Sequence, residues 1–244
     1  MAHIPGMIRA MAAVPRVHLA DPQANAQEIL ALLRQADEQR AELCVFPELC
    51  LCGYTCADLL LHPPLLAGCL QALETLLRAP VRAAFVVGLP LEIGGRLYNC
   101  AAAVCGGRIL GVVPKAHLPN SGEFYEKRWF EPGASAPESM TLCGQSVPVG
   151  GDLVFDGGRF SFGIELCEDL WVPAPPSARL CMGGALMIGG ASSNVCDHLT
   201  RGYVVDYLKF ALKPLRNVVF NISDFCIFIG SFLILIGAFF FPES

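Results

Sequence analysis

Hydrophobic residues in the first two-thirds of the chain recur with two different periods, which predict strands and helices in alternation. Asp21-Pro22 opens a predicted helix, because an acidic side chain can cap free N–H groups and proline fits the first turn. A second stripe of apolar residues at helical spacing runs from Leu65 to Leu77. Short apolar runs predict strands at residues 7–19 ("MIRAMAAVPRVHL"), 42–46 ("ELCVF") and 83–90 ("AAFVVGLP").

Two glycine pairs predict β-hairpins. Gly106-Gly107 separates "RLYNCAAAVC" from "RILGVVPK", and Gly157-Gly158 separates "LVFD" from "RFSFGIELC". The segment "VPAPPSARLCMGG" predicts a loop followed by a short helix, and "ALMIGG" predicts one more strand. Helices that alternate with strands and hairpins indicate a layered α/β fold with a mixed sheet.

The chain changes character after Val195, which divides it into two predicted regions, 1–195 and 196–244. The second region contains an apolar run, 225–241, in which Ser231 is the one polar side chain. This run is slightly shorter than the ~20 residues that a membrane-spanning helix needs. Three interpretations stay open: a tail anchor, a buried hydrophobic helix, or a translated frame that is not the coding one. A membrane is an expected partner only under the first.

Composition narrows the class of protein. The chain has 17 Lys and Arg against 22 Asp and Glu, a net charge of −5, and no basic run, so a nucleic-acid partner is not expected. We expect no signal peptide, because Arg9 and Arg16 interrupt the apolar N-terminal stretch. The twelve cysteines are therefore expected to be reduced thiols of a cytoplasmic protein. Cys50, Cys52 and Cys56 lie near one histidine, His62, but their spacing matches no zinc motif, so no metal is expected.

Three residues with chemical potential each follow a predicted strand. They are Glu48 in "VFPEL", Lys115 in "GVVPK" and Cys167 in "GIELC". Strand ends are where α/β folds place reactive groups, although for each residue taken alone a surface charge or a core thiol is the favoured interpretation. Cys167 is surrounded by three carboxylates, Glu165, Glu168 and Asp169, which disfavour a reactive thiolate unless a cation lies nearby.

Taken together, the three residues and their contexts resemble the nitrilase, or carbon–nitrogen hydrolase, superfamily. The branch that they resemble most is that of the glutaminase domains of glutamine-dependent NAD⁺ synthetases. The resemblance covers about residues 8–193 and is carried by "VFPELCLCGYTCADLLL", "VVGLPL", "RLYNCAAAVCGGRILGVVPKAHLPN", "EFYEKRWFEPG" and "GIELCEDLWVPAPPS". It implies a four-layer α-β-β-α sandwich, which we expect to be incomplete at its C-terminal end.

The resemblance also implies roles for the site residues. Cys167 would be the nucleophile, Glu48 the general base, and Lys115 the cation that offsets the carboxylates around the thiol. Glutamine would be hydrolysed through a thioester. Substrate-binding and supporting positions are implied as well: of two candidate second glutamates, Glu126 is preferred to Glu123, and the others are Phe124, Glu168, Tyr54 and Ser192. Near Ser192, "GGASSN" lacks the leading asparagine usual in the family.

The resemblance implies that amide hydrolysis needs no cofactor and that the ammonia would serve glutamine-dependent NAD⁺ synthesis. ATP and Mg²⁺ would belong to a synthetase domain, whose S-G-G-x-D-S motif does not occur in this chain. A homo-oligomer is a possible assembly. Two alternatives stay open: a stand-alone nitrilase-type amidase that acts on another small amide, and a truncated fragment without activity.

Overall fold

The computed structural model describes residues 8–136, 138–158, 160–183, 208–209 and 219–220. The chain divides into two compact units, Met1–Met187 and Ile188–Ser244. In the second unit, β10 (Leu208–Lys209) and β11 (Val219–Phe220) form an antiparallel pair. The predicted strand at 185–190, Ser192 and the apolar run 225–241 lie outside the described residues.

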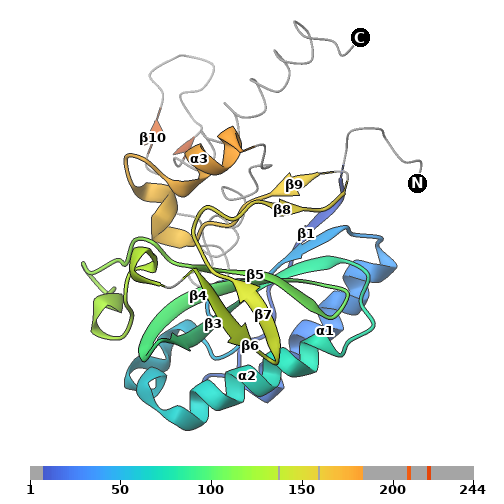
Figure 1. The fold of residues 1–244 in the computed structure, drawn as a ribbon, viewed down its shortest axis with the longest axis horizontal. Coiled ribbons are helices and arrows are strands. Elements are labelled where there is room, and N and C mark those ends of the chain that lie inside the picture. The colour runs from blue at the N-terminus through green and yellow to red at the C-terminus, as the bar shows by residue number, and fades with distance from the viewer. Residues whose placement is uncertain (1–7, 137, 159, 184–207, 210–218, 221–244) are drawn as a thin grey trace, which may run out of the picture. The chain divides into compact units, whose positions relative to one another are not determined.

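The first unit is built on a five-stranded mixed sheet with the order β1-β2-β3-β4-β5 (Figure 1). Strands β1 to β3 are parallel, and β4 and β5 continue the sheet as an antiparallel meander. The mixed sheet predicted from the sequence is thus confirmed. The strands are β1 (Ala10–Ala12), β2 (Leu43–Val45), β3 (Ala84–Ile93), β4 (Arg96–Cys105) and β5 (Arg108–Pro114).

Glycine pairs close the turns of the meander. Gly106 and Gly107 have φ angles of 56° and 75°, which suit the tight turn that joins β4 to β5, and the predicted hairpin is confirmed. The pairing of these two strands shifts by one residue between Ala103 and Val104, as in a β-bulge.

The strand predicted over 7–19 is shorter than expected. Only Ala10–Ala12 pairs with β2, and Pro15 lacks the N–H that a longer ladder would need.

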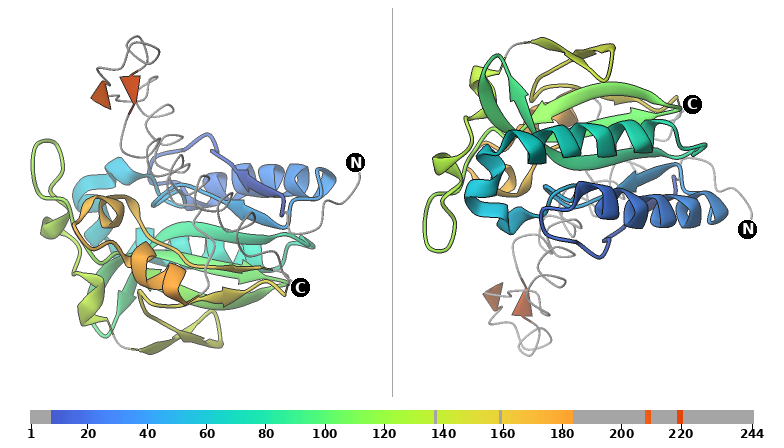
Figure 2. Two further views of the ribbon diagram at one scale, coloured as in Figure 1. Left: turned by 90° about the horizontal axis from the view of Figure 1, so that it is seen from above. Right: turned by 90° about the horizontal axis from the view of Figure 1, so that it is seen from below.

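Two helices cover one face of the sheet (Figures 1 and 2). Helix α1 (Pro22–Glu38) begins as predicted, since Oδ1 of Asp21 accepts a hydrogen bond of 3.1 Å from the backbone N–H of Ala24. Helix α2 (Pro63–Leu77) follows the predicted apolar stripe. Their buried side chains form one core with those of β2–β5 that face them. This core includes Ile29, Leu33, Leu73, Leu76, Phe85, Val87, Cys100 and Val112.

The opposite face of the sheet is covered by a short hairpin. Strands β8 (Phe155–Asp156) and β9 (Ser161–Phe162) confirm the predicted hairpin in a shorter form. A Cβ atom on Gly111 of β5 would lie 2.8 Å from the ring of Phe155, so the absence of a side chain there lets the hairpin approach the sheet. A further hairpin, β6 (Ser139–Leu142) and β7 (Gln145–Pro148), was not expected from the sequence.

Short helical segments complete the described part of the first unit. They are η1 (Tyr54–Leu61), η2 (Glu126–Arg128), η3 (Gly133–Ser135), η4 (Cys167–Trp171) and α3 (Pro176–Met182), the last of which matches the predicted short helix. Among the described residues, no single helix combines the length and apolar character needed to cross a membrane. The pair formed by η1 and α2 meets that test of length and composition only jointly, and it bends by 117°.

Candidate functional site

The predicted base and the predicted cation are in direct contact. Glu48 lies in the segment that follows β2, and Lys115 lies directly after β5. Nζ of Lys115 is 2.7 Å from Oε1 of Glu48, and the Lys115 side chain is completely buried whereas that of Glu48 is 14% exposed. A buried lysine ammonium needs an anionic partner to offset the loss of hydration, and Glu48 provides one for Lys115.

The segment that carries Glu48 is seated closely on the sheet at Gly88 of β3. A Cβ atom on Gly88 would lie 2.4 Å from the backbone nitrogen of Leu49 and 2.7 Å from the carbonyl oxygen of Pro47. The backbone N–H of Leu51 donates a hydrogen bond of 3.1 Å to the carbonyl oxygen of Gly88. Gly88 therefore defines how far Glu48 stands from the sheet.

A second buried carboxylate completes the charge cluster. Oε1 of Glu126 in η2 is 2.7 Å from Nζ of Lys115 and accepts a hydrogen bond of 2.6 Å from the hydroxyl of Tyr54. Glu126 is 1% exposed, whereas Glu123 is exposed. Of the two candidate glutamates, the structure thus brings Glu126 to Lys115. Tyr54, expected only to pack near Glu48, has a specific polar contact in addition.

Asn99 is a member of the cluster that the sequence interpretation missed. Its side-chain Nδ2 lies 2.7 Å from Oε1 of Glu48 and 3.4 Å from Oε2 of Glu126, and the residue is fully buried. The one signal for it in the sequence is a polar residue within the apolar run "YNCAAAV". We refer to Glu48, Lys115, Glu126, Asn99 and Tyr54 as the carboxylate–lysine cluster.

Burial and charge act in opposite directions on the two central groups. Burial raises the pKa of Glu48, the Lys115 ammonium offsets part of that rise, and the Glu126 carboxylate adds to it, with a net increase. Burial lowers the pKa of Lys115, but the charges of Glu48, Cys167 and Glu126 outweigh it, so its pKa is raised overall. Lys115 therefore stays protonated, while Glu48 has an increased affinity for a proton.

Cys167 is exposed and lies at a sharp change of backbone direction. It is the first residue of η4 and has a φ of 44°, an uncommon value for a residue with a side chain. Strained conformations of this kind are frequent at functional sites. The influence of Cys167 on the pKa of both Lys115 and Tyr54 shows that the thiol is electrostatically close to the carboxylate–lysine cluster.

Two of the carboxylates beside Cys167, those of Asp169 and Glu165, accept hydrogen bonds from backbone N–H groups, and the expectation that Lys115 offsets the negative charge around the thiol stays a prediction. Asp169 is buried and accepts hydrogen bonds from the backbone N–H groups of Ala116 (3.3 Å), His117 (2.7 Å) and Leu166 (3.2 Å). His117 also approaches it with Nδ1, at 3.0 Å. Asp169 therefore joins the chain just after Lys115 to the chain just before Cys167.

Glu165, two residues before Cys167, is bonded through one oxygen, and its Oε1 is buried without a hydrogen-bond partner among the described residues. Its Oε2 accepts a hydrogen bond of 2.9 Å from the backbone N–H of Ser177 in α3. Burial raises the pKa of Glu165, and the contact with Ser177 offsets part of the rise. Glu168 is half-buried. The three acidic neighbours of Cys167 thus differ in environment, a distinction that the sequence does not reveal.

An exposed set of contacts ties together the two segments that carry Tyr54 and Glu126. Asp58 of η1 accepts hydrogen bonds from Nε (2.8 Å) and Nη2 (3.0 Å) of Arg128 and from Nε1 of Trp129 (2.9 Å). Phe124 is half-buried, and its ring lies edge-on to that of Tyr54 with centroids 6.2 Å apart. Phe124 therefore borders the cluster, and its role in shaping a substrate pocket stays a prediction.

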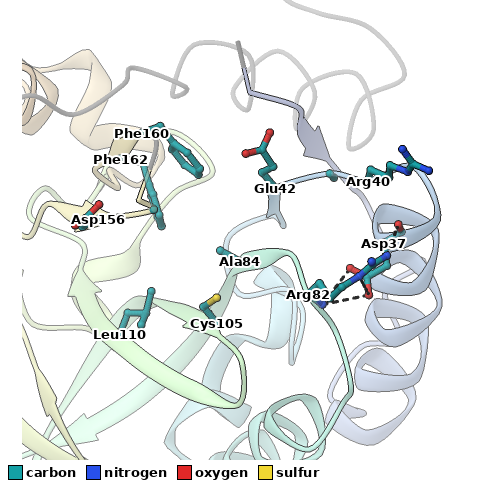
Figure 3. Close-up of a pocket in the computed structure, with 12 residues that line it drawn as sticks. Asp37, Arg40, Glu42, Arg82, Ala84, Cys105, Leu110, Asp156, Phe160 and Phe162 are labelled. Atoms are coloured by element: carbon teal, nitrogen blue, oxygen red, sulfur yellow. Dashed lines mark hydrogen bonds and ion pairs between the residues drawn. The ribbon is translucent and has the colours of Figure 1, made fainter. Parts of the chain in front are cut away.

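A pocket of about 520 Å³ lies elsewhere on the first unit (Figure 3). Glu42, just before β2, lines it, whereas Glu48 follows that strand at its other end. None of its lining residues belongs to the carboxylate–lysine cluster; they include Asp37, Arg40, Arg82, Cys105, Phe160 and Phe162. Within the described ranges, no group of three or more His, Cys, Asp or Glu side chains is arranged to hold a metal ion.

Two family models match the sequence. The one described as Carbon-nitrogen hydrolase matches residues 10–196, and the one described as Signal peptidase (SPase) II matches residues 170–240. The first covers most of the chain, including every residue of the carboxylate–lysine cluster and Cys167. The second covers less than a third of the chain, and most of its residues lie outside those that the structure describes.

Curated relatives match the same region. The glutamine-dependent NAD(+) synthetase of Mycobacterium tuberculosis (strain H37Rv) is 39% identical over 194 residues, which cover 78% of this chain and 29% of that protein. That of Rattus norvegicus is 32% identical over 185 residues, or 71% of this chain and 26% of that protein. The chain therefore spans less than a third of the length of these relatives.

Solved structures agree with the fold. The glutamine-dependent NAD+ synthetase from Acinetobacter baumannii, in complex with ADP, superposes with a TM-score of 0.60 at 28% identity, over 78% of this chain and 36% of that one. An amidase from Nesterenkonia sp. gives 0.58 at 22% identity, over 73% and 62%. The second likeness is one of fold alone. Both confirm the mixed α/β fold class that the sequence predicts.

Proposed function

The chain belongs to the carbon–nitrogen hydrolase family, and from this premise we propose that Glu48, Lys115 and Cys167 hydrolyse the side-chain amide of glutamine. The observation that carries the proposal is the buried contact between Glu48 and Lys115, at 2.7 Å, with the exposed, strained Cys167 electrostatically close to it. Glutamine is proposed as the substrate because the names of the curated relatives specify glutamine dependence.

In the proposed reaction, Glu48 takes the proton of the Cys167 thiol, and the thiolate attacks the amide carbon of glutamine. Negative charge develops on the amide oxygen, where the Lys115 ammonium and a backbone N–H near Cys167 stabilise it. Glu48 then passes its proton to the leaving ammonia, which leaves a thioester. Water deprotonated by Glu48 hydrolyses the thioester to glutamate and restores the thiol.

The surrounding residues support this cycle. A raised pKa suits Glu48 to act first as a base and then as an acid, since it increases the affinity of the carboxylate for the thiol proton while the Lys115 ammonium limits that rise. Glu126 holds Lys115 from a second side, and Tyr54 holds Glu126. Phe124, Glu168 and Ser192 are assigned to the binding of the glutamine backbone and side chain.

The ammonia released is proposed to supply glutamine-dependent NAD⁺ synthesis, the activity in the names of the curated relatives. This chain matches less than a third of their length, so the step that consumes ammonia is assigned to sequence that they contain beyond the matched region. ATP and Mg²⁺ would serve that step. Amide hydrolysis through a thioester needs neither, because every bond change is carried by the thiol, the base and water.

The test is ammonia release from L-glutamine by the 244-residue chain, compared with its Cys167→Ala and Cys181→Ala variants. Cys181 is the matched control, because it is also a free, exposed cysteine. We expect Cys167→Ala to abolish release and Cys181→Ala to retain it. Turnover of butyramide without turnover of glutamine would favour a general amidase. If neither amide is turned over by the folded chain, the proposal is wrong and an inactive fragment is favoured.

A further inference from the structure

Asn99 occupies a position in the sheet that turns its side chain toward the ion pair. It lies on β4 directly opposite Lys115, since the pairs Ala101–Val113 and Cys100–Pro114 continue to that position and the Lys115 N–H donates to the Asn99 carbonyl oxygen at 2.8 Å. Opposite residues on neighbouring strands project to the same face. The side chains of Asn99 and Lys115 therefore leave the sheet side by side.

The amide of Asn99 contacts both carboxylates with one nitrogen. Nδ2 is 2.7 Å from Oε1 of Glu48 and 3.4 Å from Oε2 of Glu126, and an amide nitrogen carries two hydrogens. The orientation of the amide is determined by these neighbours, because its oxygen would repel two carboxylates. Asn99 is 0% exposed, so solvent does not compete for its amide in either contact.

The charges of the cluster explain why a neutral donor suits this position. With all groups ionised, two buried carboxylates face one ammonium, which leaves an uncompensated negative charge. A second cation would neutralise it but would also reduce the basicity of Glu48. An amide stabilises both carboxylates without adding charge. Lys115 and Asn99 both approach Oε1 of Glu48, which assigns Oε2 to the thiol proton.

We propose that Asn99 is a positioning residue for the amide hydrolysis. It holds Glu48 and Glu126 apart on either side of Lys115 and directs the second oxygen of Glu48 toward Cys167. This inference rests on the proposed function, because it assigns to Glu48 the role of base for Cys167. The groups whose charge acts on Glu48 are Lys115 after β5 and Glu126 in η2; the same two carboxylates raise the pKa of Tyr54 in η1, and the charge of Cys167 at η4 raises the pKa of Lys115.

The test replaces Asn99 by Leu, which has a similar volume and no donor, and by Asp, which has the same shape and adds a third carboxylate. We expect kcat for glutamine to fall about 10- to 100-fold in Asn99→Leu, the loss typical of one hydrogen bond to a charged group. The acid limb of the pH profile of kcat/KM should move to higher pH in both variants, since each makes the charged form of Glu48 less favourable.

Asn25→Leu is the matched control, because Asn25 is also fully buried but donates to the backbone carbonyl oxygens of His18 and Leu51. It should lower stability and leave the acid limb in place. An unmoved acid limb in folded Asn99→Leu or Asn99→Asp overturns the inference. If Asn99→Leu does not fold, the acid limb of the isosteric Asn99→Asp variant tests the inference instead.

A second readout separates this inference from the proposed function. The rate of iodoacetamide modification of Cys167 as a function of pH, followed by mass spectrometry of its peptide, reports the thiolate without any turnover. If the wild-type chain releases no ammonia from glutamine, the proposed function fails, and a changed profile in Asn99→Asp still supports the positioning role. If glutamine is hydrolysed and both profiles match wild type, the role of Asn99 alone is refuted.

Discussion

Replacing Gly88 by alanine should impair the site by displacing the segment that carries Glu48. The added Cβ would lie 2.4 Å from the backbone nitrogen of Leu49, whereas ordinary contacts begin at 3.4 Å, so the segment must move by about 1 Å. The neighbours are backbone atoms and cannot rotate away. A shift of this size takes Glu48 from 2.7 Å to about 3.7 Å from Lys115, beyond hydrogen-bond range.

We expect Gly88→Ala to cost about 1–3 kcal/mol of unfolding free energy, the range for overpacking. We also expect kcat to fall about 100-fold, as for a displacement of about 1 Å of a catalytic group. Urea denaturation and ammonia release measure the two effects. Gly151→Ala is the matched control, because nothing lies within 4 Å of its Cβ position. Loss of stability with wild-type kcat would refute the idea that Gly88 sets the place of Glu48.

Three further outcomes are expected. Glu126→Gln removes a negative charge that raises the pKa of Glu48, so the acid limb of kcat/KM should move to lower pH; a shift to higher pH would contradict this reading of the cluster. Asp169→Asn should reduce the rate of Cys167 alkylation in the folded protein, since Asp169 positions the Cys167 segment. A lower urea midpoint with an unchanged alkylation rate would indicate a purely structural role. Leu73→Ala in the α2 core should cost about 2–5 kcal/mol without moving the pH profile, checked by urea denaturation.

The sequence was sufficient for the parts of the site that follow strands. Glu48 and Lys115 each follow an apolar run, but their roles and the preference for Glu126 over Glu123 came from the resemblance to the carbon–nitrogen hydrolases, and the burial of Glu126 agrees with that preference. The start of helix α1 at Asp21 could be predicted from the sequence, because helix capping is a local interaction. Such features depend on residues that are close in the sequence.

Asn99 could not be found in this way, because its role depends on strand register. If β4 and β5 paired without interruption from the Gly106-Gly107 turn, Pro114 would stand opposite Asn99. The one-residue shift between Ala103 and Val104 places Lys115 there instead. No local sequence pattern predicts that shift in register.

The order of these parts along the chain has a consequence for biosynthesis. The carboxylate–lysine cluster is drawn from residues 48–126, whereas the proposed nucleophile comes 41 residues after the last of these, at Cys167. Because synthesis proceeds from the N-terminus, every residue of the cluster leaves the ribosome before Cys167 does. We therefore expect the Cys167 thiol to reach its proposed base only when Asp169 has joined the Cys167 segment to the strand end at Ala116 and His117.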